Sequence, residues 1–282
     1  MGVFLDPVRE YGLIGALSRG LSDPAGVYRY LRQDEGGRVL PKQQFECPPR
    51  PTELVDFVTD LGVEASRREI CDTWLDLCDD ETFRSEVRSA FASTAAGPDK
   101  FYHNWRDVLY VLIRVVRATR VVETGVRGGL SSAYMLTALA HEDRGRLVSI
   151  DIGDTSLFPR DLDAVEPGWI VPQRLRSRWD LRIESSLRAL PSVLDEDTDV
   201  FLSDVPNELL RDELSIAARR MRPGSIIVTC CPRGSEAETI WQEFADGALD
   251  ATATATRWMS DDGRSDLYAG VLAEQVDVSP DG

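Results

Sequence analysis

The sequence predicts an α/β fold: a doubly wound parallel sheet of five strands that ends in an antiparallel hairpin, preceded by a mostly helical extension. Between residues 120 and 246, short apolar runs alternate with stretches of helical periodicity, a pattern typical of parallel sheets with helices on both faces. Two further strand-like runs, ATATATRWM and DLYAGVLAE, are separated only by SDDGRS. Because so short a turn joins antiparallel neighbours, these two runs predict a closing hairpin.

The helical extension is predicted by the first third of the chain. Residues 1–50 contain proline and glycine interruptions and no long period, which indicates an irregular arm with short helices. Apolar side chains then repeat at helical spacing up to Gly62, a natural stop, and again after Ser66, which has capping-box spacing with Glu69. A further amphipathic helix is expected after Asn104, a favourable N-cap residue, and leads directly into the first strand.

The alternating region predicts the strands and helices of the sheet domain. Strands are expected at 120–123, 146–151, 180–185, 199–204 and 225–231, and helices near 131–141, 208–220 and 235–246. Ser235 and Glu238 repeat the capping-box spacing at the start of the last helix.

The segment 152–179 is long for a connection in this fold, and loops of such length are usually functional or disordered. Its aromatic and arginine side chains favour an ordered lid over an anionic or sugar-like ligand, with a packed surface cover as the alternative. These side chains are Trp169, Arg174, Arg176, Arg178 and Trp179.

The charge of the chain excludes one class of partner and indicates an environment. A net charge of −16 argues against nucleic-acid binding, because phosphate contacts require a basic face. Only two of the 32 basic residues are lysines, Lys42 and Lys100. An acidic, lysine-poor surface favours a halophilic protein, whose carboxylates stay hydrated in concentrated salt, and a GC-rich genome is the alternative explanation for the arginines.

Neither a membrane span nor a metal site is expected. Apolar runs fall short of the roughly 20 residues that span a bilayer, and the N-terminus lacks the features of a signal peptide, so we expect a cytoplasmic protein. The five cysteines show no CxxC or CxxxH spacing and predict reduced, structural thiols. His141 is expected to be structural, and His103 is a candidate base only if the helix before the first strand crosses the carboxyl edge of the sheet.

The stretch VVETGVRGGLSS, which spans the end of the first strand, predicts a cofactor site. Ligands of doubly wound sheets bind at the carboxyl ends of the strands, at the topological switch point. Gly125 permits a sharp turn and Gly129 a close approach, while Glu123 can accept hydrogen bonds from a cationic or hydroxylated ligand. Asp151 ends the second strand, 22 residues past Gly129, where a carboxylate usually binds an adenosine ribose.

The residue between the glycines disfavours a dinucleotide. A dinucleotide loop reads G-x-G-x-x-G, and here Arg127 takes the place of the middle glycine. Its side chain would crowd a pyrophosphate, and the carboxylate of Glu123 suits the ammonium end of a methionine moiety better than two phosphates. An NAD-dependent oxidoreductase therefore remains a less favoured alternative to a protein that binds a sulfonium cofactor.

Three segments carry a family resemblance. E-T-G-V-x-x-G-L-S-S and RLVSID resemble motifs I and II of the class I S-adenosylmethionine-dependent methyltransferases, and MRPGSIIV resembles the segment before their fifth strand. Residues 168–191 are similar to a branch that acts on small molecules or sugars. The likeness covers about residues 101–275, between the extension at 1–100 and a tail at 276–282.

The resemblance implies a Rossmann-like fold, S-adenosylmethionine as cofactor and a small-molecule or sugar acceptor, and it leaves the formation of a homo-oligomer open. It also implies cofactor contacts from Glu123, Thr124, Gly125, Val126, Gly129, Ser131, Asp151, Ile152, Glu184 and Ser185.

The segment after the fourth strand supplies the candidates for catalysis. The branch reads H-D-S-x-H-x-Y-E there, whereas in FLSDVPNELL Asp204 is kept and Ser203 and Asn207 stand where the histidines would be. Asp204 is the expected base for an alcohol nucleophile, with capping of the next helix as its alternative role. Asn207 could orient a substrate or share a metal with Asp204. The sequence thus predicts O-methylation of a small molecule or glycan precursor, and the altered motif leaves open a binding or scaffold protein that has lost catalysis.

Overall fold

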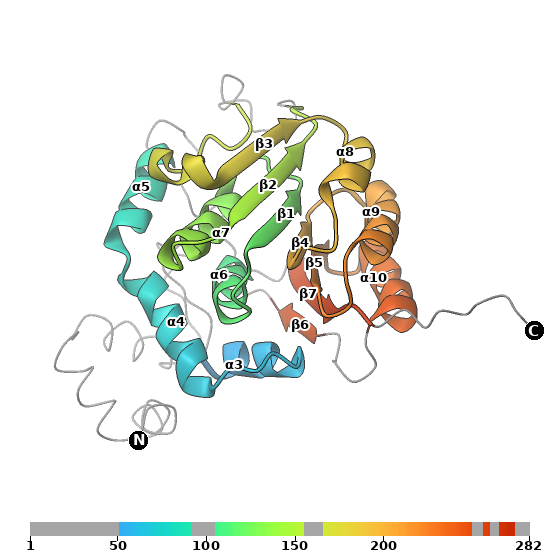
Figure 1. Cartoon of the computed structure of the whole chain (residues 1–282), viewed down its shortest axis with the longest axis horizontal. Coiled ribbons are helices and arrows are strands. Elements are labelled where there is room, and N and C mark those ends of the chain that lie inside the picture. The colour runs from blue at the N-terminus through green and yellow to red at the C-terminus, as the bar shows by residue number, and fades with distance from the viewer. Residues whose placement is uncertain (1–50, 92–104, 155–165, 250–255, 260–264, 274–282) are drawn as a thin grey trace, which may run out of the picture.

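The computed structural model describes residues 51–91, 105–154, 166–249, 256–259 and 265–273. Its seven-stranded sheet has the order β3-β2-β1-β4-β5-β7-β6 (Figure 1). Strands β1 to β5 pair in parallel, and β7 pairs antiparallel with both β5 and β6. This arrangement confirms the predicted fold class. The strands are β1 (Arg120–Thr124), β2 (Arg146–Asp151), β3 (Trp179–Ile183), β4 (Val200–Ser203), β5 (Ile226–Pro232), β6 (Thr256–Met259) and β7 (Ser265–Val271).

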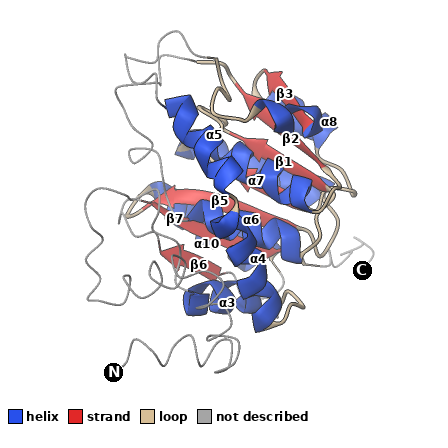
Figure 2. Ribbon diagram, turned by 90° about the vertical axis from the view of Figure 1, so that its left-hand side faces the viewer, coloured by secondary structure: helices blue, strands red, loops and turns tan. Residues whose placement is uncertain are grey.

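Helices cover both faces of the sheet. One hydrophobic core lies between the sheet and α6 and α7, with α4 and α5 packed outside them and α3 next to α4 (Figure 2). A second core lies between the other face and α8, α9 and α10 (Figure 1). The helices are α3 (Pro51–Asp60), α4 (Arg67–Asp79), α5 (Glu81–Phe91), α6 (Trp105–Val115), α7 (Leu130–His141), α8 (Ser186–Val193), α9 (Asn207–Arg220) and α10 (Glu236–Ala248), and a 3₁₀ helix, η5 (Gln173–Arg178), precedes β3.

The N-terminal helices share the core of the sheet domain. Helix α4 packs on α6, and α3 packs on β6, where the rings of Phe57 and Trp258 meet edge to face with centroids 6.1 Å apart. The first hydrophobic core therefore runs without interruption from α3 to β7. The boundary at residue 100 falls in 92–104, outside the described residues, and stays a prediction.

Two local predictions need correction. Helix α8 was not expected, because its eight residues include Pro191 and carry only a short apolar stripe, Ala189, Leu190 and Val193.

Ser66 caps α4 as predicted, accepting a hydrogen bond from the Glu69 N–H at 3.1 Å. Ser235 stands at the N-cap of α10, but its side chain makes no capping hydrogen bond there. Asn104 lies outside the described residues.

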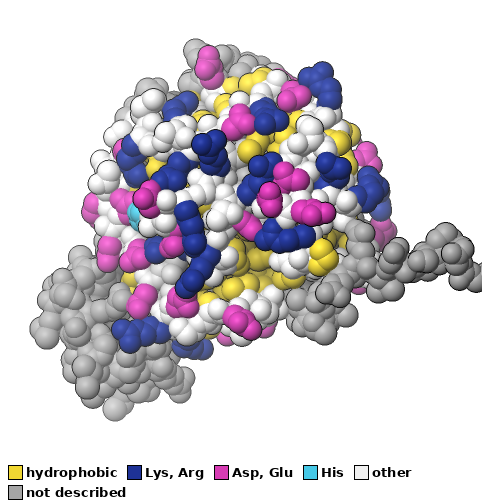
Figure 3. Space-filling model, in the orientation of Figure 1, with side chains coloured by type: hydrophobic (Ala, Val, Ile, Leu, Met, Phe, Trp, Pro, Cys, Tyr) yellow, Lys and Arg dark blue, Asp and Glu magenta, His cyan; other side chains and the backbone are white. Residues whose placement is uncertain are grey.

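The described surface mixes acidic side chains with arginines. Figure 3 shows both kinds interspersed over one face, and the basic ones are arginines because Lys42 and Lys100 lie outside the described ranges. Many form pairs, such as Arg222 with Asp199 at 2.6 Å and Arg211 with Glu243 at 2.6 Å. Among the helices of the described ranges, none is both long and apolar enough to cross a bilayer.

Candidate functional site

The predicted site residues meet at the carboxyl edge of the sheet. Asp151 is the last residue of β2, and Gly125, Glu184 and Asp204 directly follow β1, β3 and β4. Strand β1 lies between β2 and β4, so the order of the strands reverses at β1. In open α/β sheets this switch point is where ligands bind.

The glycine loop turns sharply between β1 and α7. Gly125 and Gly129 have positive φ angles of 82° and 81°, and Arg127 between them adopts a φ of 49°. A Cβ on Gly125 would lie 1.9 Å from the backbone oxygen of Asp204, so only glycine fits there. The loop thus runs directly against the segment that carries the predicted base, and the Asp204 N–H donates to the Thr124 oxygen at 3.0 Å.

Asp151 holds the glycine loop in this conformation. Its Oδ2 accepts the N–H groups of Val126 and Arg127, both at 2.9 Å, and its Oδ1 accepts the N–H of Gly153 at 2.7 Å. These bonds account for the left-handed conformation of Arg127, which is uncommon for a residue with a side chain. A carboxylate offers about four acceptor positions, so capacity remains for a ligand hydroxyl. The ribose role of Asp151 stays a prediction.

Glu123 is fully buried beneath the loop, on the α7 face of the sheet. It accepts hydrogen bonds from the hydroxyls of Ser131, of Ser132 at 2.5 Å and of Ser149 at 2.8 Å. Burial raises the pKa of Glu123 to about 7, helped by the charge of Asp204 and opposed by the three hydroxyls. The carboxyl therefore ties α7 and β2 to β1, and its contact with a cofactor stays a prediction.

The predicted cofactor residues divide into a buried and an open group. In the buried group, side chains support the loop from within; it comprises Glu123, Thr124, Val126 and Ser131. In the open group, at least part of each side chain reaches the surface; it comprises Asp151, Ile152, Glu184 and Ser185. The two glycines, Gly125 and Gly129, shape the turn.

Two large apolar side chains are exposed beside Asp151. Ile152 is 58% exposed and Ile183, at the end of β3, is 53% exposed. Gly153 leaves room beside Ile183, since a Cβ there would lie 2.7 Å from its Cγ2. Ile183 was missed from the sequence, although an apolar residue at the carboxyl end of a strand, just before Glu184, was a usable signal. The pair offers an apolar surface to a flat ring next to the hydrogen-bonding groups of Asp151.

Asp204 is partly buried at the end of β4. Burial raises the pKa of its carboxyl, and the charges of Arg106 and Arg127 oppose that rise. The alternative that Asp204 caps the next helix is not what the structure shows, because α9 begins at Asn207 with Pro206 as its N-cap residue and no capping side chain. Among the described residues, no group of three or more histidine, cysteine or acidic side chains is placed to hold a metal.

The segment before β3 is a packed cover rather than a lid. Its backbone runs along the glycine loop, with the Gly168 N–H donating to the Arg127 oxygen at 2.7 Å and the Ile170 N–H to the Gly128 oxygen at 2.9 Å. Trp169 stacks edge to face on Phe91, with centroids 5.0 Å apart.

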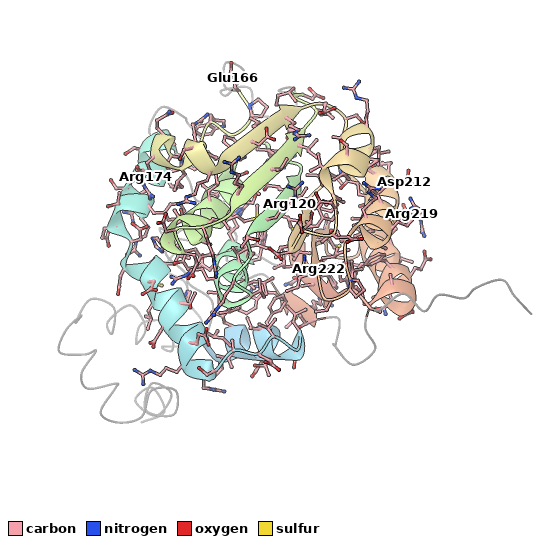
Figure 4. All side chains as sticks on the ribbon, in the orientation of Figure 1. Arg120, Glu166, Arg174, Asp212, Arg219 and Arg222 are labelled. Atoms are coloured by element: carbon pink, nitrogen blue, oxygen red, sulfur yellow. The ribbon has the colours of Figure 1, made fainter. Side chains whose placement is uncertain are left out.

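The predicted ligand-binding side chains of this cover have partners within the chain. Arg174, labelled in Figure 4, pairs with Glu86 of α5 at 2.9 Å. Trp179 donates to Ser149 at 2.9 Å, Arg176 donates to the Gly168 oxygen at 3.1 Å, and Arg178 pairs with Asp143. The Arg174 pair ties this segment to α5, and the other contacts hold it to β2, to Asp143 and to its own backbone. For the described residues 166–179, the expectation of a ligand-binding lid was therefore wrong.

Within the described ranges, the histidine of α7 has a structural position away from the candidate site. His141 lies in the last turn of α7, with Nδ1 2.6 Å from the Tyr110 hydroxyl and Nε2 3.2 Å from Asp80, as expected for a structural role. His103 lies outside the described residues.

Comparisons with known proteins gave a domain match and similar folds. Residues 122–229 match a family model described as a methyltransferase domain. The structure is similar to that of a candidate O-methyltransferase from Klebsiella pneumoniae, with a TM-score of 0.52 and 18% identity over 71% of this chain and 93% of that one. It also resembles the O-methyltransferase TomG of Streptomyces achromogenes, a protein of tomaymycin synthesis solved with SAM, with a TM-score of 0.49 and 19% identity over 69% and 91% of the chains. No curated protein matches the sequence significantly.

The matched segment begins in β1 and ends in β5, so it contains the glycine loop, Asp151 and Asp204. Residues 122–229 therefore match a methyltransferase domain, and the sheet that contains them has the Rossmann-like fold of the similar Klebsiella structure.

Proposed function

We propose that the protein is an S-adenosylmethionine-dependent methyltransferase that methylates an oxygen of a small molecule or glycan precursor. The proposal is carried by one observation: within the segment that matches a methyltransferase domain, Asp151 holds the glycine loop, and Ile152 and Ile183 are exposed beside it.

The residues of this edge fit an adenosine-containing cofactor. Asp151 has acceptor capacity for the ribose hydroxyls. Ile152 and Ile183 would pack against the adenine, with Glu184 and Ser185 at its polar edge. The buried Glu123 would act on the cofactor's ammonium end only through the loop that it supports, because its oxygens are occupied by serine hydroxyls.

S-adenosylmethionine would supply an electrophilic methyl group for an in-line displacement. The chain itself aligns the acceptor hydroxyl and accepts its proton. Asp204 suits the second task, because burial raises its pKa and so increases its affinity for a proton. Asn207, the first residue of α9, would orient the acceptor through its amide.

Calorimetric titration with S-adenosylmethionine or S-adenosylhomocysteine in molar salt tests the proposal. We expect saturable heat from the wild-type protein and weaker binding by Asp151→Ala. Folded protein that gives no heat with millimolar ligand would refute the proposal, and an unchanged affinity of Asp151→Ala would refute the ribose role.

A binding or scaffold protein without catalysis is the second candidate, and the altered motif after β4 favours it. The hydroxyl of Ser203 points away from the site, since it donates to the buried Glu213 at 2.8 Å. Ser203 and Asn207 stand where the related branch has histidines, and Asn207 is therefore the position whose change bears on catalysis. Cofactor binding without turnover of any acceptor in a panel of alcohols, phenols and sugars would favour this second candidate. Self-association, salt preference and cytoplasmic location stay predictions.

A further inference from the structure

Helix α9 carries a buried carboxyl that the predicted site does not use. Glu213 lies next to Leu214 on the apolar side of the helix, and its side chain is fully buried. Its Oε2 accepts hydrogen bonds from the hydroxyls of Thr124, at 2.6 Å, and Ser203, at 2.8 Å. One carboxyl oxygen thus joins the ends of the two central strands, β1 and β4.

A third hydroxyl extends the cluster to the next element. Burial raises the pKa of Glu213, and the nearby Ser186 hydroxyl, at the start of α8, works in the opposite direction without forming a hydrogen bond like those of Thr124 and Ser203. The other oxygen, Oε1, is buried and has no hydrogen-bond partner among the residues that the structure describes.

The three hydroxyls link the cluster to the candidate site. They come from three separate elements, and each one adjoins a candidate site residue in the sequence. Thr124 precedes Gly125, Ser186 follows Ser185, and Ser203 precedes Asp204.

Packing alone does not account for an acid at this position. A leucine would continue the apolar side that Leu210 and Leu214 present to the second core. Burying a carboxyl costs free energy that its hydrogen bonds offset only in part, so a buried acid is a poor choice for stability. Its hydrogen bonds are directional, however, and they fix the distances between the elements that donate them.

We propose that Glu213 is a positioning residue that fixes the glycine loop, the start of α8 and the segment after β4 relative to one another. The inference rests on the proposed function, because that function makes these three segments parts of a methyltransferase site. Displacements well below 1 Å already impair a site that must align two reactants, so such a brace would matter for methyl transfer.

Amide hydrogen exchange of the full-length protein tests the proposal without any ligand. Glu213→Gln and Glu213→Leu should speed exchange in peptides that contain 125–129, 184–188 and 204–207. The expected increase is about tenfold or more, the equivalent of one lost hydrogen bond to a charged group. Leu214→Val is the matched control, because it loosens the same helix without touching the hydroxyls, and it should leave these three peptides at the wild-type rate.

A second variant protects the test against misfolding. Ser203→Ala removes one hydroxyl only, and it should speed exchange in 204–207 more than in 125–129. Wild-type exchange rates in Ser203→Ala and in a folded Glu213 variant would overturn the proposal. So would an equal increase in Leu214→Val, which would reduce Glu213 to a stabilising role.

Titration with S-adenosylhomocysteine then separates this inference from the proposed function. We expect Glu213→Gln to raise the Kd about tenfold and to lower kcat, with Leu214→Val unchanged in both. Faster exchange in the Glu213 variants of a protein that binds no ligand at all would refute the proposed function and leave the brace standing. Ligand binding that is tight and equal in wild type and Glu213→Gln would refute the brace and leave the function standing.

Discussion

Replacing Glu123 by Gln tests the electrostatics of the predicted site. Glu123 is fully buried among three serine hydroxyls, and burial raises its pKa from 4.5 to about 7. Between these two pH values the folded protein keeps a proton on Glu123 that the unfolded chain releases. The stability that this group contributes is therefore complete below pH 4.5 and is lost as the pH rises through 7. The difference corresponds to about 3 kcal/mol, since each pH unit between the two pKa values is worth about 1.4 kcal/mol.

Gln cannot ionise, so Glu123→Gln should lose this part of the pH dependence. We expect the free energy of unfolding of the variant, relative to wild type, to rise by about 3 kcal/mol between pH 4.5 and pH 8. Urea unfolding in molar salt, followed by circular dichroism, measures both proteins at each pH. Glu208→Gln, which removes an exposed carboxyl from α9, is the control. A difference between Glu123→Gln and wild type that stays constant across this range would refute the burial argument.

Four further outcomes are expected. Gly125→Ala places a Cβ 1.9 Å from the Asp204 oxygen at a positive φ, so it should lower the free energy of unfolding by about 3 kcal/mol or more; a wild-type melting temperature would contradict this. Asp204→Asn should lower kcat by a factor of about 10² to 10⁴ while the Kd for S-adenosylhomocysteine changes less than about twofold, and equal kcat values would remove Asp204 as the base. Ile183→Ser should weaken calorimetric binding of that ligand about tenfold without changing stability, because the side chain is 53% exposed. Dialysis into low salt should unfold the protein if its acidic surface is adapted to salt, and an unchanged circular dichroism spectrum would contradict that.

The fold was predictable because its signals are local. Each strand is a short apolar run, and the predicted ranges lie within a few residues of β1 to β5. Helix α4 begins where Ser66 and Glu69 predict it. The elements that were missed or misjudged depend on the rest of the molecule. Helix α8 contains Pro191, which argues against a helix when the residue is read alone. The arginines of the cover were taken for ligand-binding groups because their acidic partners are distant in sequence, as with Arg174 and Glu86.

The candidate site was predictable in position but not in the direction of its side chains. Strand-end residues such as Asp151 and Asp204 were located correctly at the carboxyl edge, since parallel strands bring their ends together. Which face each side chain takes depends on the pleat, and which partner it finds depends on packing. Glu213 gave one local signal, an acid beside apolar Leu210 and Leu214, but nothing in the sequence pairs it with β1 and β4.

The pleat of β1 explains why two buried carboxyls lie beneath one loop. Glu123 and Thr124 are consecutive, so their side chains point to opposite faces of the sheet. On one face Glu123 accepts hydrogen bonds from serine hydroxyls of α7 and β2, and on the other the Thr124 hydroxyl donates to Glu213 of α9. Asp151 holds the loop itself from the neighbouring strand. A loop fixed from three directions loses little conformational freedom when a ligand arrives, so more of the contact energy would remain for binding. By the same argument the loop should tolerate few substitutions, because each of these contacts helps to set its conformation.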